Sequence, residues 1–201
     1  MSRFRVLLLF TLPGLVVCSA NAQKNEAAFT GGGYFALSST FSPNSATALQ
    51  GSFAHRLFKV PLLGFYAELP VTGSFQSSVP FQNVPVLNLL ANSYSALFIT
   101  PGIRVKLAPS FPVSPYVAVG GGYARFNRHF TNGTTSANST AALDFGGGLD
   151  IKIAPFIGLR GELRDFYTGD PGLLSTLGPV ATLLPQKQHN VVATAGIVVR
   201  F

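Results

Sequence analysis

The chain ends in a stretch of strict alternation, HNVVATAGIVVRF, at residues 189–201. Every second residue from Val191 to Phe201 is apolar, and the residues between them include Asn190, Thr194 and Arg200. Successive side chains of a β-strand point to opposite sides, so this period of two predicts a strand with one apolar and one mixed face.

The same alternation recurs in seven earlier segments, which are separated by turn-rich stretches. Most of these segments have the roughly 9–11 residues that a tilted membrane strand needs, or slightly more, against about 5–6 in a typical soluble strand. The eight predicted strands are Ala28–Ser38, Thr47–Arg56, Leu63–Gly73, Ser93–Leu107, Pro115–His129, Ala141–Ala154, Phe156–Thr168 and His189–Phe201.

The links between these strands alternate in length. The second, fourth and sixth links are short: Leu57–Leu62, Ala108–Ser114 and the surroundings of Pro155. The other four are longer and richer in loop residues: Ser39–Ala46, Ser74–Asn92, Phe130–Thr140 and Gly169–Gln188. Such sorting is typical of an up-and-down barrel with short turns at one end. We therefore predict an all-β fold, an eight-stranded antiparallel transmembrane β-barrel with both termini on the periplasmic side.

The N-terminus has the organisation of an export signal. Arg3 and Arg5 precede an apolar run, Val6–Val17, that is too short to span a bilayer, and a small-x-small pattern then predicts cleavage between Ala22 and Gln23. We expect residues 1–22 to be a signal peptide, removed together with Cys18, and residues 23–201 to be the barrel domain. No later run is apolar enough for a membrane helix, although 47% of residues are hydrophobic and only 10% are charged.

The charge of the predicted mature chain does not indicate a nucleic-acid partner. Removal of the signal leaves 12 of the 14 Lys and Arg residues against 7 acidic ones, a net charge of +5. These charges stand singly within alternating segments, and no basic run exists. We expect no cofactor and no thiol chemistry.

The last six residues, Gly196–Phe201, resemble the C-terminal β-signal of bacterial outer membrane proteins, with Ile197, Val199 and Phe201 at the alternating apolar positions. Glycine runs at 31–33, 120–122 and 146–148, the first two followed by Tyr, are also similar to strands of the OmpA/OmpX-like small β-barrel superfamily. The resemblance covers the whole mature chain. It implies a location in the bacterial outer membrane, contact with its lipid and lipopolysaccharide, and recognition by the barrel-assembly machinery. Since no domain is expected after Phe201, it does not imply the peptidoglycan anchoring of full-length OmpA-type proteins.

Charged residues occupy the faces opposite the apolar ones and should converge inside the barrel. An eight-stranded barrel is only wide enough for its side chains to fill, so these charges must be paired. We interpret them as a structural salt-bridge network that plugs the lumen, although a narrow ion path whose pairs exchange partners remains an alternative. The predicted network comprises Glu68, Arg104, Asp144, Arg160, Glu162 and Arg164.

Other motifs do not indicate an enzyme. No helix is expected after the glycine runs, so they are strand glycines and not phosphate-binding loops. Three histidines, His55, His129 and His189, are isolated and lack the spacing of metal ligands. Some small outer membrane barrels are lipid A-modifying enzymes that use a His, a Ser and a carboxylate, but this sequence has no His-x-Ser motif. We interpret Asn132 and Asn138 as turn residues.

Two features stay open at this level. In the fifth strand, an inward Arg125 would turn Tyr116 and Phe126 outward as two aromatic girdles, but Gly120 and Gly122 would then face lipid. The apolar links at residues 84–90 and 173–185 either pack on their neighbours, which we favour, or bind a surface partner.

We therefore predict a non-enzymatic outer membrane barrel with a structural or surface-interaction role. A small low-conductance porin is the alternative. A soluble periplasmic carrier, lipocalin-like with its apolar faces turned inward to hydrophobic ligands, is a third.

Overall fold

A computed structural model describes residues 24–36, 46–76, 91–130, 135–169 and 187–201, and the elements in these ranges are all strands. In the part of the chain that the structure describes, no helix is long and apolar enough to cross a membrane. The strands are β1 (Asn25–Ala36), β2 (Ala46–Val60), β3 (Leu63–Gln76), β4 (Ala91–Ile99), β5 (Gly102–Leu107), β6 (Val113–Phe130), β7 (Thr135–Lys152), β8 (Ile157–Gly169) and β9 (Lys187–Arg200).

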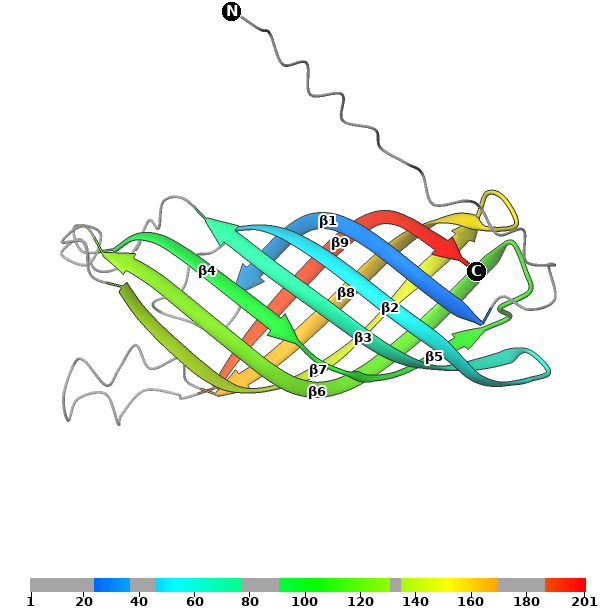
Figure 1. Ribbon diagram of the computed structural model, residues 1–201, viewed down its shortest axis with the longest axis horizontal. Helices are drawn as coiled ribbons and strands as arrows, with labels where there is room; N and C mark the ends of the chain where they lie inside the picture. The colour runs from blue at the N-terminus through cyan, green and yellow to red at the C-terminus, as the bar shows by residue number, and fades with distance from the viewer. Residues whose placement is uncertain (1–23, 37–45, 77–90, 131–134, 170–186) are drawn as a thin grey trace, which may run out of the picture.

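The strands form one closed antiparallel sheet (Figure 1). β1 pairs with both β2 and β9, so the first and last strands of the chain close the barrel. β4 and β5 both pair with β3 on one side and β6 on the other, and therefore count as one strand interrupted at Thr100 and Pro101. The fold is an eight-stranded up-and-down barrel, which confirms the predicted architecture.

Proline explains the interruption, because Pro101 has no backbone N–H to give to a strand ladder. The chains also approach closely there: a Cβ atom at Gly122 would lie 2.1 Å from the carbonyl oxygen of Ile99. Only glycine fits at such a distance, so part of the glycine run in β6 serves the close approach of two backbones.

The two ends of the barrel differ (Figure 1). At one end, the short-turn end, β2–β3, β5–β6 and β7–β8 are joined by residues 61–62, 108–112 and 153–156. Asn25 and Phe201 exchange backbone hydrogen bonds of 2.9 and 3.0 Å there, which joins the two ends of the sheet. At the other end, the long-link end, the four links at 37–45, 77–90, 131–134 and 170–186 lie outside the described residues. The predicted apolar links at 84–90 and 173–185 lie in them.

Several predicted boundaries differ from the structure, and the largest error concerns the link between the fifth and sixth predicted strands. β6 continues to Phe130 and β7 begins at Thr135, so most of the expected link 130–140 is strand. Asn138, interpreted as a turn residue, is paired with Phe126 in this hairpin, whereas Asn132 lies outside the described residues. Polar Ser, Thr and Asn residues in an exposed strand extension look like loop composition, which explains the error.

The apolar faces of the strands point outward. Large hydrophobic side chains from β1, β2, β3 and β5 to β9 are exposed, including Phe29 at 65%, Val117 at 64% and Leu143 at 59%. This is the surface that a lipid environment requires, and it is the reverse of a soluble carrier with its apolar faces inward.

The fifth predicted strand, which corresponds to β6, is no longer ambiguous. Arg125 is exposed, and Tyr116 and Phe126 are buried in the interior. The arrangement with two outward aromatic girdles is therefore wrong. Gly120 and Gly122 share the inward face, so the outer face of this strand carries Val117, Val119 and Tyr123 instead.

Candidate functional site

The interior of the barrel is the candidate site, because the charged residues meet there. The structure places all six side chains of the predicted network inside, and none of these residues is more than 6% exposed. They come from four strands of the sheet: β3, β5, β7 and β8. Ion pairs join five of the six directly to one another. The sixth, Arg160, is linked to them through Glu26, which pairs with both Arg160 and Arg104.

Arg160 is held from two sides. Its Nε and Nη2 atoms donate to the two carboxylate oxygens of Asp150 at 2.7 and 2.9 Å, a bidentate pair, and Nη2 also donates to Glu26 at 3.1 Å. Lys106 lies beside it and donates through Nζ to the same two acids, at 2.6 Å to each. Two cations and two carboxylates therefore form a closed, charge-balanced group near the short-turn end.

A second group lies deeper in the barrel. Arg164 donates to Asp144 at 2.5 Å, to Glu68 at 2.8 Å and to Glu162. Glu68 also pairs with Arg104, whose Nη1 reaches Glu26 at 3.3 Å. Glu68 and Arg104 thus join the two groups into a single network that crosses the lumen.

Four members of this network were not among the predicted residues: Glu26, Lys106, Asp150 and Arg200. Glu26 precedes the predicted start of the first strand, which begins at Asn25 instead. The other three lie on the mixed or charged faces of their strands, but nothing in the sequence shows that they reach the same partners. We call the ten residues the charged layer: Glu26, Glu68, Arg104, Lys106, Asp144, Asp150, Arg160, Glu162, Arg164 and Arg200.

The charged layer holds five acidic and five basic residues, so its side-chain charges balance. Tyr116 fills its centre, with its ring 4.6 Å from the guanidinium carbon of Arg104 and 5.1 Å from that of Arg160. Such stacking packs the flat faces of the guanidinium groups while their edges bind carboxylates. Gly148 provides the room, because a Cβ atom there would lie 2.5 Å from the Tyr116 hydroxyl.

Uncharged polar side chains border the charged layer on its inner side. Thr100 donates to Asp144 at 3.0 Å, and Gln50 donates to Glu162 at 3.2 Å while accepting from Thr72 at 2.9 Å. The Gln50 bond occupies the Glu162 oxygen that Arg164 does not use, whereas Thr100 and Arg164 share Oδ2 of Asp144. These polar side chains also separate the charges from the apolar residues beyond.

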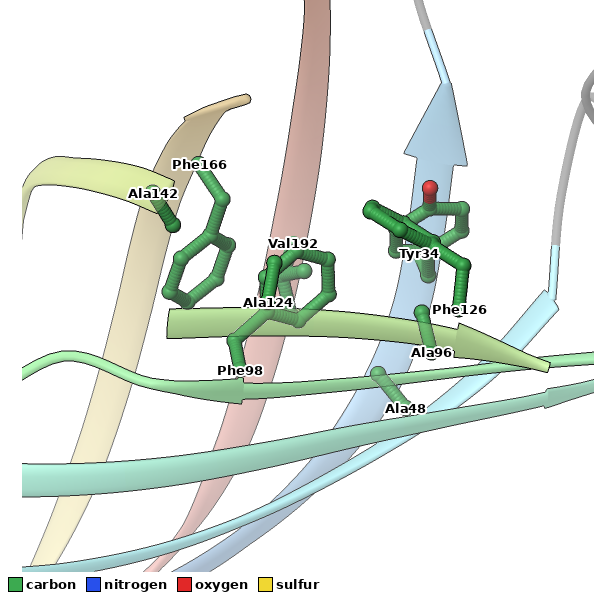
Figure 2. Packing of buried hydrophobic residues seen from close by; sticks show 9 residues of the cluster. All are labelled: Tyr34, Ala48, Ala96, Phe98, Ala124, Phe126, Ala142, Phe166 and Val192. Atoms are coloured by element: carbon green, nitrogen blue, oxygen red, sulfur yellow. The ribbon is translucent and has the colours of Figure 1, made fainter. Parts of the chain in front are cut away.

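The lumen toward the long-link end is apolar, which the sequence analysis did not predict. Figure 2 shows nine buried side chains gathered there from seven strands. The ring of Phe98 is stacked on Phe166 at 4.4 Å between centroids and meets the edge of Phe126 at 5.8 Å. We call this group the apolar layer: Tyr34, Ala48, Ala96, Phe98, Ala124, Phe126, Ala142, Phe166 and Val192.

The apolar layer is bordered in turn by polar residues. The Tyr34 hydroxyl donates to Asn190, and the Asn190 side chain donates to the Phe166 carbonyl at 2.9 Å and to Thr168 at 3.1 Å. From the short-turn end toward the long-link end, the side chains that line the lumen are therefore first charged, then neutral and polar, then apolar with aromatic rings, and then polar again at Asn190. Apart from Arg200, the side chains of both the charged and the apolar layer are buried.

The other predicted residues lie elsewhere. Ile197, Val199 and Phe201 point outward from the end of β9, with exposures of 54%, 40% and 51%. The expected cleavage position between Ala22 and Gln23 lies outside the described residues.

The histidines do not gather at one place. His55 is hydrogen-bonded to Asn25 at 2.8 Å near the short-turn end, and the side chain of His129 is not described. His189 lies on another part of the outer surface, where its Nδ1 is 2.6 Å from Asp165 and its ring packs against Tyr167. This His–Asp pair was missed because its members lie 24 residues apart. No serine among the described residues is hydrogen-bonded to His189, and no cluster there could hold a metal ion.

The nearest likeness to known proteins is structural. Neither protein-family profiles nor curated protein sequences match this chain. Among solved structures, Neisserial surface protein A is similar over 88% of this chain and 96% of its own, with a TM-score of 0.62 and 16% identity. The Yersinia pestis attachment invasion locus protein Ail, solved with the heparin analogue sucrose octasulfate, matches over 89% and 99%, with a TM-score of 0.53 and 12% identity. OprG from Pseudomonas aeruginosa matches over 89% and 97%, with a TM-score of 0.51 and 14% identity.

The fold is that of a small bacterial outer membrane β-barrel. Because the identities are low, the likeness carries the architecture and no specific activity. The residues inside this barrel must be understood from their own contacts. Those contacts pair the charges of the lumen with one another.

Proposed function

We propose that the protein is a non-enzymatic barrel of the bacterial outer membrane whose lumen is closed, with a structural role in the envelope or a binding role at its surface. One observation carries this proposal: two successive layers, one charged and one apolar, fill the lumen. An ion entering the charged layer meets side chains that are already engaged in ion pairs, and an ion entering the apolar layer would lose its hydration shell among aromatic rings.

The remaining surfaces support this role. The exposed apolar band suits contact with membrane lipid and, in the outer leaflet, lipopolysaccharide. Ile197, Val199 and Phe201, all outward on the last strand, are accessible to a barrel-assembly machinery during biogenesis. Solved neighbours include a surface protein and an attachment protein, which favours an interaction role for the long-link end.

Planar-bilayer recording of the refolded barrel tests the closed lumen. We expect no steady conductance steps, because neither layer leaves a continuous aqueous path. Steady, reproducible steps would contradict the closed lumen and establish the low-conductance pore instead. Membrane fractionation, with heat-modifiable gel mobility as the sign of a folded barrel, shows that the recorded sample is the embedded form.

A further inference from the structure

The short-turn end contains a cavity that the closed lumen does not account for. It has a volume of about 390 Å³, and we call it the vestibule. Glu26 and Asp150 of the charged layer form its floor, and the β5–β6 turn, residues 109–112, forms part of its wall. Four basic side chains also line it: Arg56, Lys59, Lys152 and Arg200.

The vestibule has an excess of positive charge. Its two acids belong to the charged layer, where five carboxylates are balanced by five cations. Arg56, Lys59 and Lys152 are outside that layer, and among the described residues no carboxylate side chain forms an ion pair with any of them. Three positive charges therefore surround a cavity whose own acids are already neutralised.

The wall of the vestibule is held in a fixed shape. Lys59 donates to the Ser110 hydroxyl at 2.6 Å, and the Ser114 hydroxyl donates to the Ala108 carbonyl at 2.8 Å. The backbone N–H of Ala108 donates to the Leu62 carbonyl at 2.6 Å, which joins the β5–β6 turn to the β2–β3 turn. Both Ala108 (φ 47°) and Leu62 (φ 68°) are left-handed, a conformation that non-glycine residues keep only where neighbouring contacts enforce it.

The guanidinium group of Arg200 has a donor that is not used in the structure. Its contacts with Glu26 and Asp150 are long, at 3.5 and 3.3 Å. Its Nη1 atom is buried and has no hydrogen-bond partner among the described residues. A buried donor without an acceptor is unfavourable, and a small rotation of the guanidinium toward an anion in the vestibule would satisfy it.

We propose that the vestibule binds a phosphate-type oxyanion. Such an anion carries up to two charges on several oxygens, which matches three or four cations around one small cavity, and guanidinium and ammonium groups are the usual partners of phosphate. The cavity volume lies at the small end of ligand sites, so it suits one or two phosphoryl groups and not a folded polyanion. The phosphate is either free or part of a lipid headgroup at the membrane surface.

Calorimetric titration tests the site with inorganic pyrophosphate and the barrel folded in zwitterionic micelles at low salt. We expect binding at one site per barrel. A Lys59→Gln, Lys152→Gln double variant should bind roughly tenfold more weakly, as expected for the loss of two exposed charge contacts. Both lysines are exposed and outside the charged layer, so the variant should fold, which heat-modifiable gel mobility verifies.

Arg125→Gln is the matched control, because Arg125 is an exposed cation on the outer face of β6, away from the vestibule. It should leave pyrophosphate affinity unchanged. Absence of binding by the unsubstituted barrel would overturn the proposal. So would an equal loss in the double variant and the Arg125→Gln variant, since that result would mean a general attraction to a basic protein.

Nanodiscs distinguish the two sources of phosphate. If a lipid headgroup occupies the vestibule, phosphatidylglycerol in the disc should compete with pyrophosphate and remove the difference between the unsubstituted barrel and the double variant. If the anion is free, that difference should be the same in phosphatidylglycerol and in neutral discs. Both results support the site, whereas loss of the difference in neutral discs would contradict it.

Discussion

The two buried layers of the lumen fill the same barrel with opposite chemistry. In the charged layer, ten side chains are joined by ion pairs, and Arg164 alone has three acidic partners among the described residues. In the apolar layer, the Phe98 ring packs against Phe126 and Phe166, and small alanines lie among the large rings. The comparison shows that buried side chains of either chemistry can occupy the interior of a narrow barrel. Substitutions in the two layers should therefore lower the free energy of unfolding by different amounts.

Substitutions in the charged layer should lower the free energy of unfolding most, because removing one member leaves buried charges unpaired. Arg164→Met deletes the cation shared by Glu68, Asp144 and Glu162. We expect a loss of about 3–5 kcal/mol in the free energy of unfolding, the usual cost of breaking a buried ion pair. Urea titration in lipid vesicles measures it.

The comparable substitution at the surface, Arg125→Met, should change the stability by less than about 0.5 kcal/mol. If both variants lose the same stability, the buried pairing is not what matters. A stability of Arg164→Met equal to that of the unsubstituted barrel would show that the three carboxylates relax by taking up protons or water.

Substitutions in the apolar layer should lower the free energy of unfolding less, and the loss should grow with the side-chain volume that is removed. Phe98→Ala removes a ring stacked on Phe166 and leaves a cavity, but strands no charge. We expect a loss of about 3 kcal/mol, at the lower end for such truncations, with Phe98→Leu losing less than half of that. Equilibrium unfolding of the two variants gives the comparison.

Conductance recordings of Phe98→Ala sharpen the contrast. The charged layer remains complete in this variant, so we expect it to conduct no better than the unsubstituted barrel. Steady steps from Phe98→Ala would mean that the apolar layer alone closes the lumen and that the charged layer is permeable.

Substitutions at the border between the apolar layer and its polar neighbours should lower the free energy of unfolding least. Tyr34→Phe keeps the ring and removes the hydroxyl that donates to Asn190, so Asn190 loses one of its bonds. We expect a loss of about 1 kcal/mol, typical of one buried neutral hydrogen bond. Thermal gel-shift measurements would detect this, and a loss equal to that of Phe98→Ala would place Tyr34 among the essential packing residues.

The strand faces could be predicted from the sequence, whereas the partners of the charges could not. Alternation alone placed Arg160 and Arg164 opposite Leu159 and Leu163, and burial agrees with this assignment. It could not show that Arg160 pairs with Glu26, because these residues are 134 positions apart and meet only when the barrel closes. Glu26 was also lost to a boundary error of three residues at the start of β1.

The apolar layer shows a second kind of limit. Phe98, Phe126 and Phe166 lie on the same faces as alanine, threonine or arginine, so alternation by itself marks those faces as mixed. In β6 the mixture was enough to leave the direction of Arg125 undecided. The direction became certain only from the register with β7 and β4, which fixes the parity of the whole strand.

The sequence by itself predicted the closed β-architecture and the separation of each strand into an apolar face and a mixed or charged face, and the exposures in the structure then settled that the apolar faces point outward. Both predictions follow from local geometry, since the side-chain period of a strand and the sorting of short and long links need no knowledge of distant contacts. Only the tertiary structure decided which charges meet, that aromatic rings close the other half of the lumen, and that basic side chains surround a vestibule at the short-turn end. Those features depend on strand register and barrel closure, which bring residues from opposite ends of the chain to the same depth.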